Sequence, residues 1–281
     1  MFGRSCDCIS SISRKINMRS IILMYHDVFS DSPAPFIPRS SAMYHISKQS
    51  FIQHLAIIKK SKLNVLTVSE YLDNKEKNSI CITFDDGWKG AFNIAMPILK
   101  DFGYRCTYFI TKDFIGREGF IDEKGIMMAS EAGMEIGVHG TTHRMLSNCS
   151  NDEIIWEFSH CKHYLESLTG QKVVSASMPG GDWNEIIASC AKKAGLKLLC
   201  SSKLGLNVPS TNLFKLKRIP IKGSTSDSDL ERYCQHNISK DLIKSALYQL
   251  PKRILGMKRY SHFRRWVLGE NSSNTIEIYK P

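Results

Sequence analysis

The sequence has no long hydrophobic run and no cysteines spaced for pairing. The apolar run "IILMY" near the N-terminus is too short for the hydrophobic region of a signal peptide, and it leads directly into His26 and Asp27. We therefore expect neither a signal peptide nor a membrane-spanning segment. The nine cysteines are an odd number, and only Cys6 and Cys8 lie close together. This pattern favours reduced thiols and a cytoplasmic protein.

Nucleic-acid-binding modules, internal repeats and low-complexity tracts are also absent from the sequence. Basic residues are not interleaved with aromatic ones over most of the chain, and much of the formal net charge of +11 lies in the C-terminal stretch "PKRILGMKRYSHFRRW". We therefore predict that nucleic acid is not a partner. The 281 residues, of which 42% are hydrophobic, suffice for one large domain or two small ones.

Short apolar segments typical of strands alternate with amphipathic segments typical of helices. The predicted strands are "SIILMY", "NVLTV", "SICITF", "RCTYFI", "MEIGV", "VVSAS" and "LKLLCSS". This alternation predicts an α/β fold with a parallel sheet, and the short apolar strands favour a closed barrel over the alternative, an open doubly wound sheet. We expect a polar leader at residues 1–19, the barrel at 20–240 and a basic amphipathic tail at 241–281.

Two carboxylates directly follow a predicted strand in "ITFDDGW". Asp85 and Asp86 would point in opposite directions if the strand continued, so they can share a site only where it ends. Gly87 permits a sharp turn at that point. Because two adjacent like charges repel, the pair indicates a bound cation. The alternative is an ordinary surface turn.

Two histidines follow another predicted strand in "HGTTH". The spacing of His139 and His143 lets both imidazoles face one ion, although two unrelated polar histidines would give the same pattern. With one carboxylate they supply two nitrogens and one oxygen, and they leave coordination positions open for water and substrate. His26 and the "PGG" turn also follow strands, and in a β/α barrel such residues meet at one face.

The combination of "ITFDDG" with the later "MEIGVHGTTH" resembles the first two motifs of the polysaccharide deacetylase family, also called the NodB-homology or carbohydrate esterase family four domain. The stretches "ILMYHDV" and "SKQSFIQHL" are similar to its usual N-terminal approach, so the resemblance covers residues 21–202. It implies a distorted (β/α)7-type barrel as a single catalytic domain. It also implies a hydrolase of carbon–nitrogen bonds that removes N-acetyl groups from amino sugars in polysaccharides or oligosaccharides.

The resemblance also implies roles for individual residues. Asp86, His139 and His143 would bind one divalent metal ion, for which we expect zinc, with cobalt, nickel or manganese as alternatives. Asp85 would be the general base that takes a proton from the attacking water. The backbone N–H of Gly180, in "SMPGG", is the candidate donor to the oxyanion.

The sequence departs from the family pattern at two places. The family's arginine that braces the catalytic aspartate corresponds to Ser177, which cannot supply a charge. The late Leu-x-His motif has no clear match, because the corresponding region contains only His236, in a predicted helix. His26 is the better-placed general acid, although a structural histidine at the barrel rim is an alternative. Asp182 would orient that histidine or cap a helix starting at Trp183.

Substrate contacts are expected from residues beside these motifs. Trp88 and Trp183 directly follow site motifs, and their rings either stack on a sugar or pack in the protein. The other expected contacts are Pro179, Gly181 and Asp182.

Several questions about function stay open at this point. A hydrolase of small cytosolic amides and a catalytically weakened carbohydrate-binding protein are alternatives, the latter because the arginine and the late histidine are missing. In the tail, apolar residues at helical spacing lie beside basic ones, which suits either an anionic membrane surface or packing on the barrel. We expect a cytoplasmic protein, with peripheral contact at the inner membrane face as an option, and the sequence indicates no oligomeric state.

Overall fold

The computed structural model describes residues 18–33, 39–181 and 183–247. Nearly all of the predicted leader, Asp182 and most of the predicted tail, including its apolar and basic stripe, lie outside these residues. No helix in the described parts of the chain is long and apolar enough to cross a lipid bilayer.

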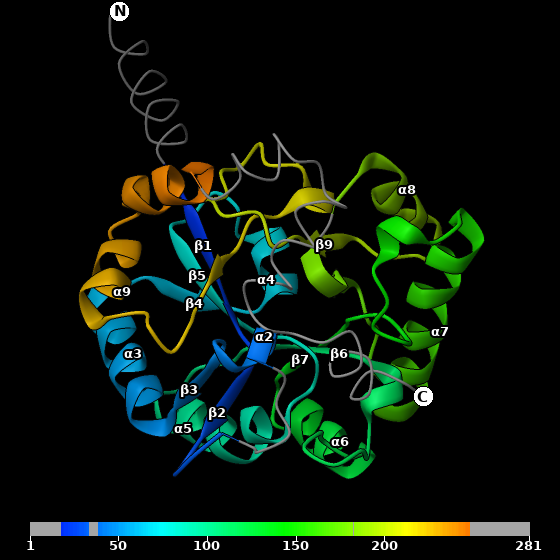
Figure 1. The fold of residues 1–281 in the computed structure, drawn as a ribbon, viewed down its shortest axis with the longest axis horizontal. Coiled ribbons are helices and arrows are strands. Elements are labelled where there is room, and N and C mark those ends of the chain that lie inside the picture. The colour runs from blue at the N-terminus through cyan, green and yellow to red at the C-terminus, as the bar shows by residue number, and fades with distance from the viewer. Residues whose placement is uncertain (1–17, 34–38, 182, 248–281) are drawn as a thin grey trace, which may run out of the picture.

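A curled sheet of parallel strands forms the centre of the molecule (Figure 1). In spatial order its strands are β10 (Ile219–Pro220), β1 (Ser20–Tyr25), β5 (Ser79–Phe84), β6 (Thr107–Ile110), β7 (Glu135–Val138), β8 (Ser175–Ser177) and β9 (Leu198–Cys200). β4 (Asn64–Leu66) pairs with the first half of β5, and β6 pairs with its second half. A separate small sheet joins β2 (Asp27–Phe29) to β3 (His45–Ser47).

The two edges of the curled sheet meet at Leu216. Its N–H donates to the carbonyl of Leu199, and its carbonyl accepts from the N–H of Ser201. This single bridge joins β9 to the segment that leads into β10. The predicted distorted barrel of parallel strands is therefore confirmed, with closure limited to a few hydrogen bonds.

Alternate residues of the strands face the helices and the inside of the curl. Ile80, Ile82 and Phe84 of β5 belong to the large core beneath the helices. A separate buried cluster contains Ile22 and Phe109, together with residues of β5 and β9. Side chains from strands so far apart in the sheet can meet only on its concave side, so this cluster fills the barrel. By strand alternation Asp85 continues the inward-facing row of β5.

Helices cover the outside of the curl (Figure 1). They are α3 (Lys48–Ser61), α5 (Met96–Asp101), α6 (Glu123–Glu131), α7 (Asn151–Thr169), α8 (Glu185–Lys193) and α9 (Asp227–Cys234). Shorter turns are α2 (Arg39–Ala42), α4 (Val68–Asp73), the π-helical η1 (Ala91–Ala95) and the 3₁₀ segments η2 (Lys112–Phe114), η3 (Leu146–Asn148), η4 (Pro179–Gly181) and η5 (Leu213–Lys215). This arrangement leaves the carboxyl ends of the strands available for a site.

Side-chain caps define where several helices begin. A capping box starts α7, because the Ser150 side chain accepts the N–H of Glu153 and the Glu153 side chain accepts the N–H of Ser150. The start of α8 was predicted at Trp183, which is wrong. Asn184 caps this helix, because its side chain accepts the N–H of Ile187.

The core position of Ile82 leads to a stability prediction. Ile82 is 0% exposed on β5, the strand that pairs with three others. We predict that Ile82→Ala lowers the free energy of unfolding by about 2 to 5 kcal/mol, because it leaves a cavity in the core. Urea denaturation measures this loss. Ile186→Ala, at a residue that is 53% exposed, is the matched control, and equal losses would contradict the core placement.

Candidate metal centre and catalytic site

A pocket of about 270 Å³ lies at the carboxyl ends of the barrel strands. Its walls come from the end of β1, from residues that follow β1, β5, β7, β8 and β9, from α2 and the turn after it, and from β10. Six of the predicted site residues line it: His26, Asp85, Asp86, His139, His143 and Gly180. In a β/α barrel this face is where active sites are built.

The turn after β5 brings two adjacent carboxylates into the pocket. Asp85 still follows the strand, because its N–H donates to the carbonyl of Tyr25 at 3.0 Å. Asp86 then takes a left-handed backbone conformation with φ of 74°, and Gly87 follows at 96°. Such a conformation costs a non-glycine residue about 1 to 3 kcal/mol. It turns the Asp86 side chain to the same side as that of Asp85.

Asp86 converges with the two histidines. Its Oδ1 atom lies 3.1 Å from Nε2 of His139 and 3.2 Å from Nε2 of His143. The donor atoms of the three residues lie within 4.8 Å of one another, the only such group in the described part of the chain. Burial alone would raise the pKa of Asp86, but the charge of His143 and hydrogen bonds with both histidines hold it well below its usual range. Two nitrogens and an ionised oxygen suit a divalent transition metal.

Asp85 is held by an arginine from another part of the chain. Arg218, just before β10, donates from Nη1 to Oδ1 and from Nη2 to Oδ2 of Asp85, each at 2.7 Å. The guanidinium is 0% exposed, and its Nε donates to the carbonyl of Ser201 at 3.0 Å. Burial would raise the pKa of Asp85, but the charges of Arg218 and His139 outweigh it and lower that pKa. Asp85 is therefore an ionised carboxylate in a fixed orientation.

Ser177 connects the carboxylate to a metal-ligand candidate. Its hydroxyl lies 2.5 Å from Nδ1 of His139 and donates to Oδ1 of Asp85 at 3.3 Å. When Nε2 of His139 faces a metal, the ring hydrogen is on Nδ1, and Nδ1 donates a hydrogen bond to the hydroxyl of Ser177. The serine thus fixes the orientation of the imidazole, and it does so at the position where the family carries its arginine.

A buried glutamate holds the loop that carries both histidines. Glu157 of α7 is 0% exposed. It accepts the backbone N–H of Thr141 at 2.6 Å and that of Thr142 at 2.9 Å, and also the hydroxyl of Thr142. Arg144 lies 3.3 Å from the same carboxylate. The "HGTTH" loop is therefore anchored to a helix on the outside of the barrel.

His26 lies where the sequence predicts, directly after β1. It is half-buried, and its ring stacks on Tyr44 with the centroids 4.6 Å apart. Its buried Nδ1 has no hydrogen-bond partner among the described residues. Burial lowers the pKa of His26, and the negative charges of Asp86 and Asp85 oppose that effect.

Two expected substrate contacts are corrected by the structure. Trp88 is 1% exposed and packs against Phe120, so the prediction that it stacks on a sugar is wrong. Trp183 is half-buried and outside the pocket, and its Nε1 donates to the carbonyl of Phe214. The ammonium of Lys215 lies 3.5 Å over its ring and covers that face.

The turn after β8 contributes less to the pocket than expected. Pro179 is buried, Gly181 is half-buried, and neither lines the pocket. Gly180 does line it, at φ of 66°. His236 follows the end of α9 and is not part of the pocket wall.

Two residues of the site were missed in the sequence. Glu157 occupies a position on the apolar face of α7, alongside Ile154 and Phe158, and a charge on such a face is a detectable signal. Arg218 lies beside two lysines in "FKLKRIP". Nothing local distinguishes it from a surface residue.

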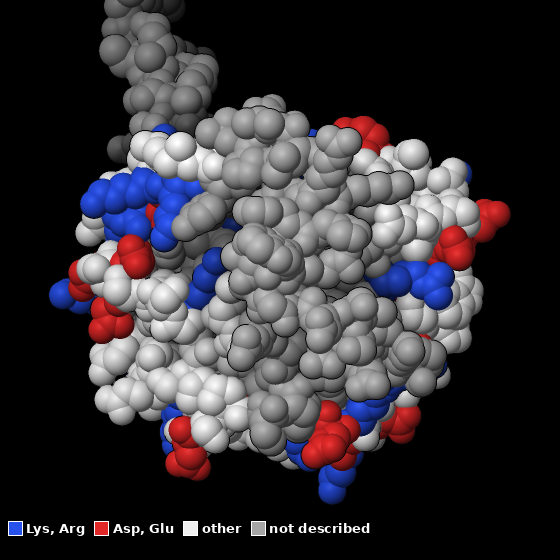
Figure 2. Space-filling model, in the orientation of Figure 1, with Lys and Arg blue, Asp and Glu red and all other residues white. Residues whose placement is uncertain are grey.

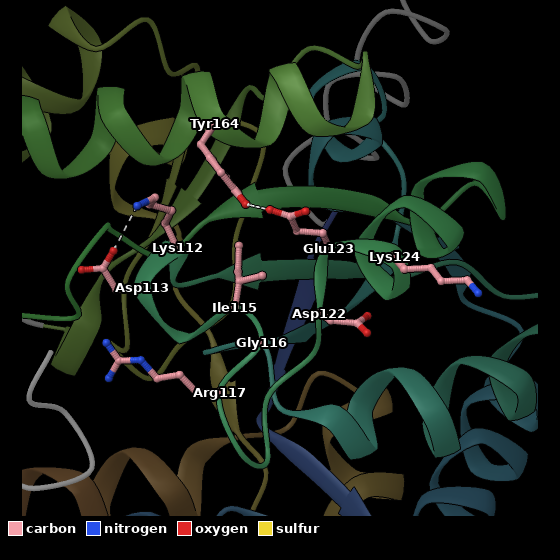
Figure 3. A pocket seen from close by; sticks show the side chains of 9 residues that line it. All are labelled: Lys112, Asp113, Ile115, Gly116, Arg117, Asp122, Glu123, Lys124 and Tyr164. Atoms are coloured by element: carbon pink, nitrogen blue, oxygen red, sulfur yellow. Dashed lines mark hydrogen bonds and ion pairs between the residues drawn. The ribbon is translucent and has the colours of Figure 1, made fainter.

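A second hollow, of about 810 Å³, lies beside η2, α6 and α7 (Figure 3). Its wall contains three basic residues, Lys112, Arg117 and Lys124, and three acidic ones, Asp113, Asp122 and Glu123. Tyr164 donates to Glu123, and Lys112 pairs with Asp113. Side chains of both signs are also distributed around the visible described surface (Figure 2). The described residues that line this hollow include neither histidine nor cysteine, and none of them lines the candidate site.

A fixed carboxylate beside a convergent set of metal-ligand side chains, at the carboxyl ends of parallel barrel strands, indicates a barrel enzyme with an acid–base group next to a candidate metal centre. Residues 73–199 match the family model described as polysaccharide deacetylase. These residues form a polysaccharide deacetylase domain, and proteins of this class hydrolyse the amide bonds of N-acetyl sugars. The predicted family and enzyme class are confirmed.

Known proteins of this family resemble the chain over most of its length. The poly-β-1,6-N-acetyl-D-glucosamine N-deacetylase of Staphylococcus aureus is 26% identical over 211 residues, which cover 68% of this chain and 72% of that protein. The solved structure of the Streptococcus pyogenes deacetylase PplD in complex with acetate has a TM-score of 0.68 at 25% identity, and the match covers 76% of this chain and 96% of that one. A polysaccharide deacetylase from Bacillus cereus has a TM-score of 0.69 at 23% identity, with 77% and 69% covered.

The buried pair of Arg218 and Asp85 can be tested by a double-mutant cycle. We predict that Arg218→Met lowers the free energy of unfolding by about 3 to 5 kcal/mol, because it leaves a buried carboxylate without its cation. The same substitution should cost less when Asp85→Asn is also present. Urea denaturation of the wild type, both single variants and the double variant measures the coupling. Strictly additive losses would contradict a direct interaction.

Proposed function

We propose that the protein is a metal-dependent N-deacetylase that removes acetyl groups from an N-acetylated amino sugar within a polysaccharide or oligosaccharide. The observation that supports this most directly is the fixed, ionised Asp85 beside the convergent Asp86, His139 and His143 in one pocket. Hydrolysis of an unreactive amide requires a general base and a metal-binding group of side chains in the same pocket.

Asp86, His139 and His143 would hold the metal ion, with zinc first and cobalt, nickel or manganese as alternatives. When bound, such an ion supplies a Lewis acid that polarises the acetyl carbonyl and makes water easier to deprotonate. Asp85 takes a proton from the attacking water at one of its carboxylate oxygens. Arg218 and Ser177 keep that carboxylate oriented during the transfer.

The remaining steps fall to residues on other walls of the pocket. Water adds to the acetyl carbon, and the backbone N–H of Gly180 stabilises the oxyanion that forms. His26 then gives a proton to the nitrogen of the sugar as the carbon–nitrogen bond breaks. Acetate and a free amino sugar are the products.

The pocket and a relative both favour a sugar substrate. A volume of about 270 Å³ is suited to one sugar unit, so a polymer would continue across the rim. The Staphylococcus aureus relative is named for poly-β-1,6-N-acetyl-D-glucosamine. We take N-acetylglucosamine polymers as the first substrates to test, in envelope or exopolysaccharide synthesis.

The two alternatives to this function differ in their support. Small acetylated amides would also fit the pocket, and assays on them beside glycan oligomers separate this function from the first. A catalytically weakened binding protein was suggested by the missing arginine and the missing late histidine. Arg218 makes the contact that this arginine would make, which favours an active enzyme.

The roles of the two aspartates lead to a prediction on catalysis. We predict that Asp85→Asn keeps the wild-type metal content but lowers acetate release by roughly two to four orders of magnitude, because it removes a base and not a ligand. Acetate release from N-acetylglucosamine oligomers and elemental analysis measure the two effects. The double variant His139→Ala, His143→Ala should lose the metal.

Two results would contradict these roles. Metal lost together with activity in Asp85→Asn would mean that the aspartates have exchanged roles. Wild-type metal content in the histidine double variant would exclude the proposed ligands.

The activity itself has a separate test. Failure of the wild type to release acetate from any acetylated amino-sugar polymer would favour the binding-protein alternative.

The C-terminal tail, which lies outside the described residues, leads to a prediction on location. Its apolar positions are Ile254, Met257, Tyr260, Phe263 and Val267, and basic residues lie beside them. We propose a cytoplasmic enzyme that contacts the inner membrane face through this tail, where each basic residue contributes on the order of 1 kcal/mol. Co-sedimentation with anionic vesicles should be lost on truncation after residue 250. No binding at low salt would favour packing of the tail on the barrel.

A further inference from the structure

Packing fixes the ring of Trp88 beside the candidate metal centre. Phe120 stacks at a tilt against it with the centroids 4.4 Å apart, and the ring of His45 meets it edge-on at 4.7 Å. Nδ1 of His45 is in turn 3.1 Å from a carboxylate oxygen of Asp27. Trp88 and Phe120 also form an antiparallel backbone bridge. Since Trp88 is 1% exposed, the direction of its indole N–H is set by the protein.

This N–H is directed at one oxygen of a metal-ligand candidate. Nε1 of Trp88 donates to Oδ2 of Asp86 at 3.0 Å. The other oxygen, Oδ1, lies within 3.2 Å of Nε2 of both His139 and His143. The two oxygens of the carboxylate therefore have different surroundings, and only Oδ1 faces the imidazoles.

We propose that Trp88 is a positioning residue that keeps Asp86 a monodentate ligand of the metal ion. The inference rests on the proposed function in one respect, that Asp86, His139 and His143 bind a divalent metal. A carboxylate whose second oxygen is unconstrained can rotate and bind the ion through both oxygens. The hydrogen bond from Trp88 opposes that rotation and so reserves a coordination position for substrate or water.

The substitution Trp88→Phe tests this directly, because it keeps an aromatic ring and removes the N–H. The full-length protein is titrated with cobalt alone, in competition with a chelator of known affinity. We expect the dissociation constant for cobalt to rise by about 10- to 100-fold. The visible absorption of the bound cobalt should also weaken, because intensity falls as the coordination number rises. A wild-type affinity together with a wild-type spectrum would overturn the proposal.

Phe120→Leu is the matched control for packing. It removes the ring that lies against Trp88 but leaves the indole N–H and Asp86 in place. Cobalt affinity and spectrum should stay close to those of the wild type. If Phe120→Leu changes both as much as Trp88→Phe does, general loosening of the aromatic cluster explains the effect, and the hydrogen bond does not.

A second variant keeps the test valid if Trp88→Phe is poorly stable. The substitution Asp86→Asn can offer its oxygen to the metal only by turning an N–H₂ group toward the Trp88 N–H, and two donors then face each other. Adding Trp88→Phe removes that conflict. The double variant should therefore bind cobalt more tightly than Asp86→Asn alone, whereas independent effects would make it bind more weakly and would contradict the proposal.

The outcomes separate this inference from the proposed function. If the wild type binds no cobalt, the metal-dependent activity itself is wrong. If the wild type binds cobalt and releases acetate while Trp88→Phe has unchanged affinity and spectrum, the function stands and the positioning role fails.

Discussion

The ion pair between Arg218 and Asp85 is the interaction on which the rest of the site depends. A carboxylate that is 2% exposed is costly to bury in ionised form unless a cation satisfies it. The guanidinium does so with two hydrogen bonds of 2.7 Å, and it also binds the carbonyl of Ser201 after β9. One side chain therefore joins three parts of the barrel at its carboxyl end. The neighbouring Asp86 remains available for the histidines because Asp85 already has its own counter-ion.

The site requires a buried guanidinium that faces the carboxylate of Asp85. Which strand of the barrel supplies this guanidinium matters less. The resemblance to the family implies an arginine at the position of Ser177, the last residue of β8. In this chain Arg218 comes from the segment before β10, and the small side chain of Ser177 leaves room to link His139 with Asp85. The ion pair between an arginine and Asp85 is therefore kept, although the arginine comes from another part of the chain. The hydroxyl of Ser177 joins the hydrogen-bond network.

Local patterns were sufficient to predict seven strands of the curled sheet and the metal-ligand candidates, but not β10 or the small sheet of β2 and β3. Strand alternation, the Asp85–Asp86 turn and the spacing of "HGTTH" are all short-range signals, and Asp86 adopts the left-handed conformation that such a turn needs. Arg218 is 133 residues from Asp85, so no local signal could place it there. Trp88 was assigned to the substrate because a tryptophan beside a site motif looks the same in sequence whether its ring faces solvent or the core. The burial of Trp88 and the packing of Phe120 and His45 against it decide the question.

The matched family segment, residues 73–199, contains every metal-ligand candidate but neither His26 nor Arg218. Those two residues are brought in by β1 and β10, which pair side by side although they come from opposite ends of the barrel sequence. Arg218 reaches Asp85 from the segment that leads into β10, so the complete acid–base set depends on contacts with strands outside the matched family segment.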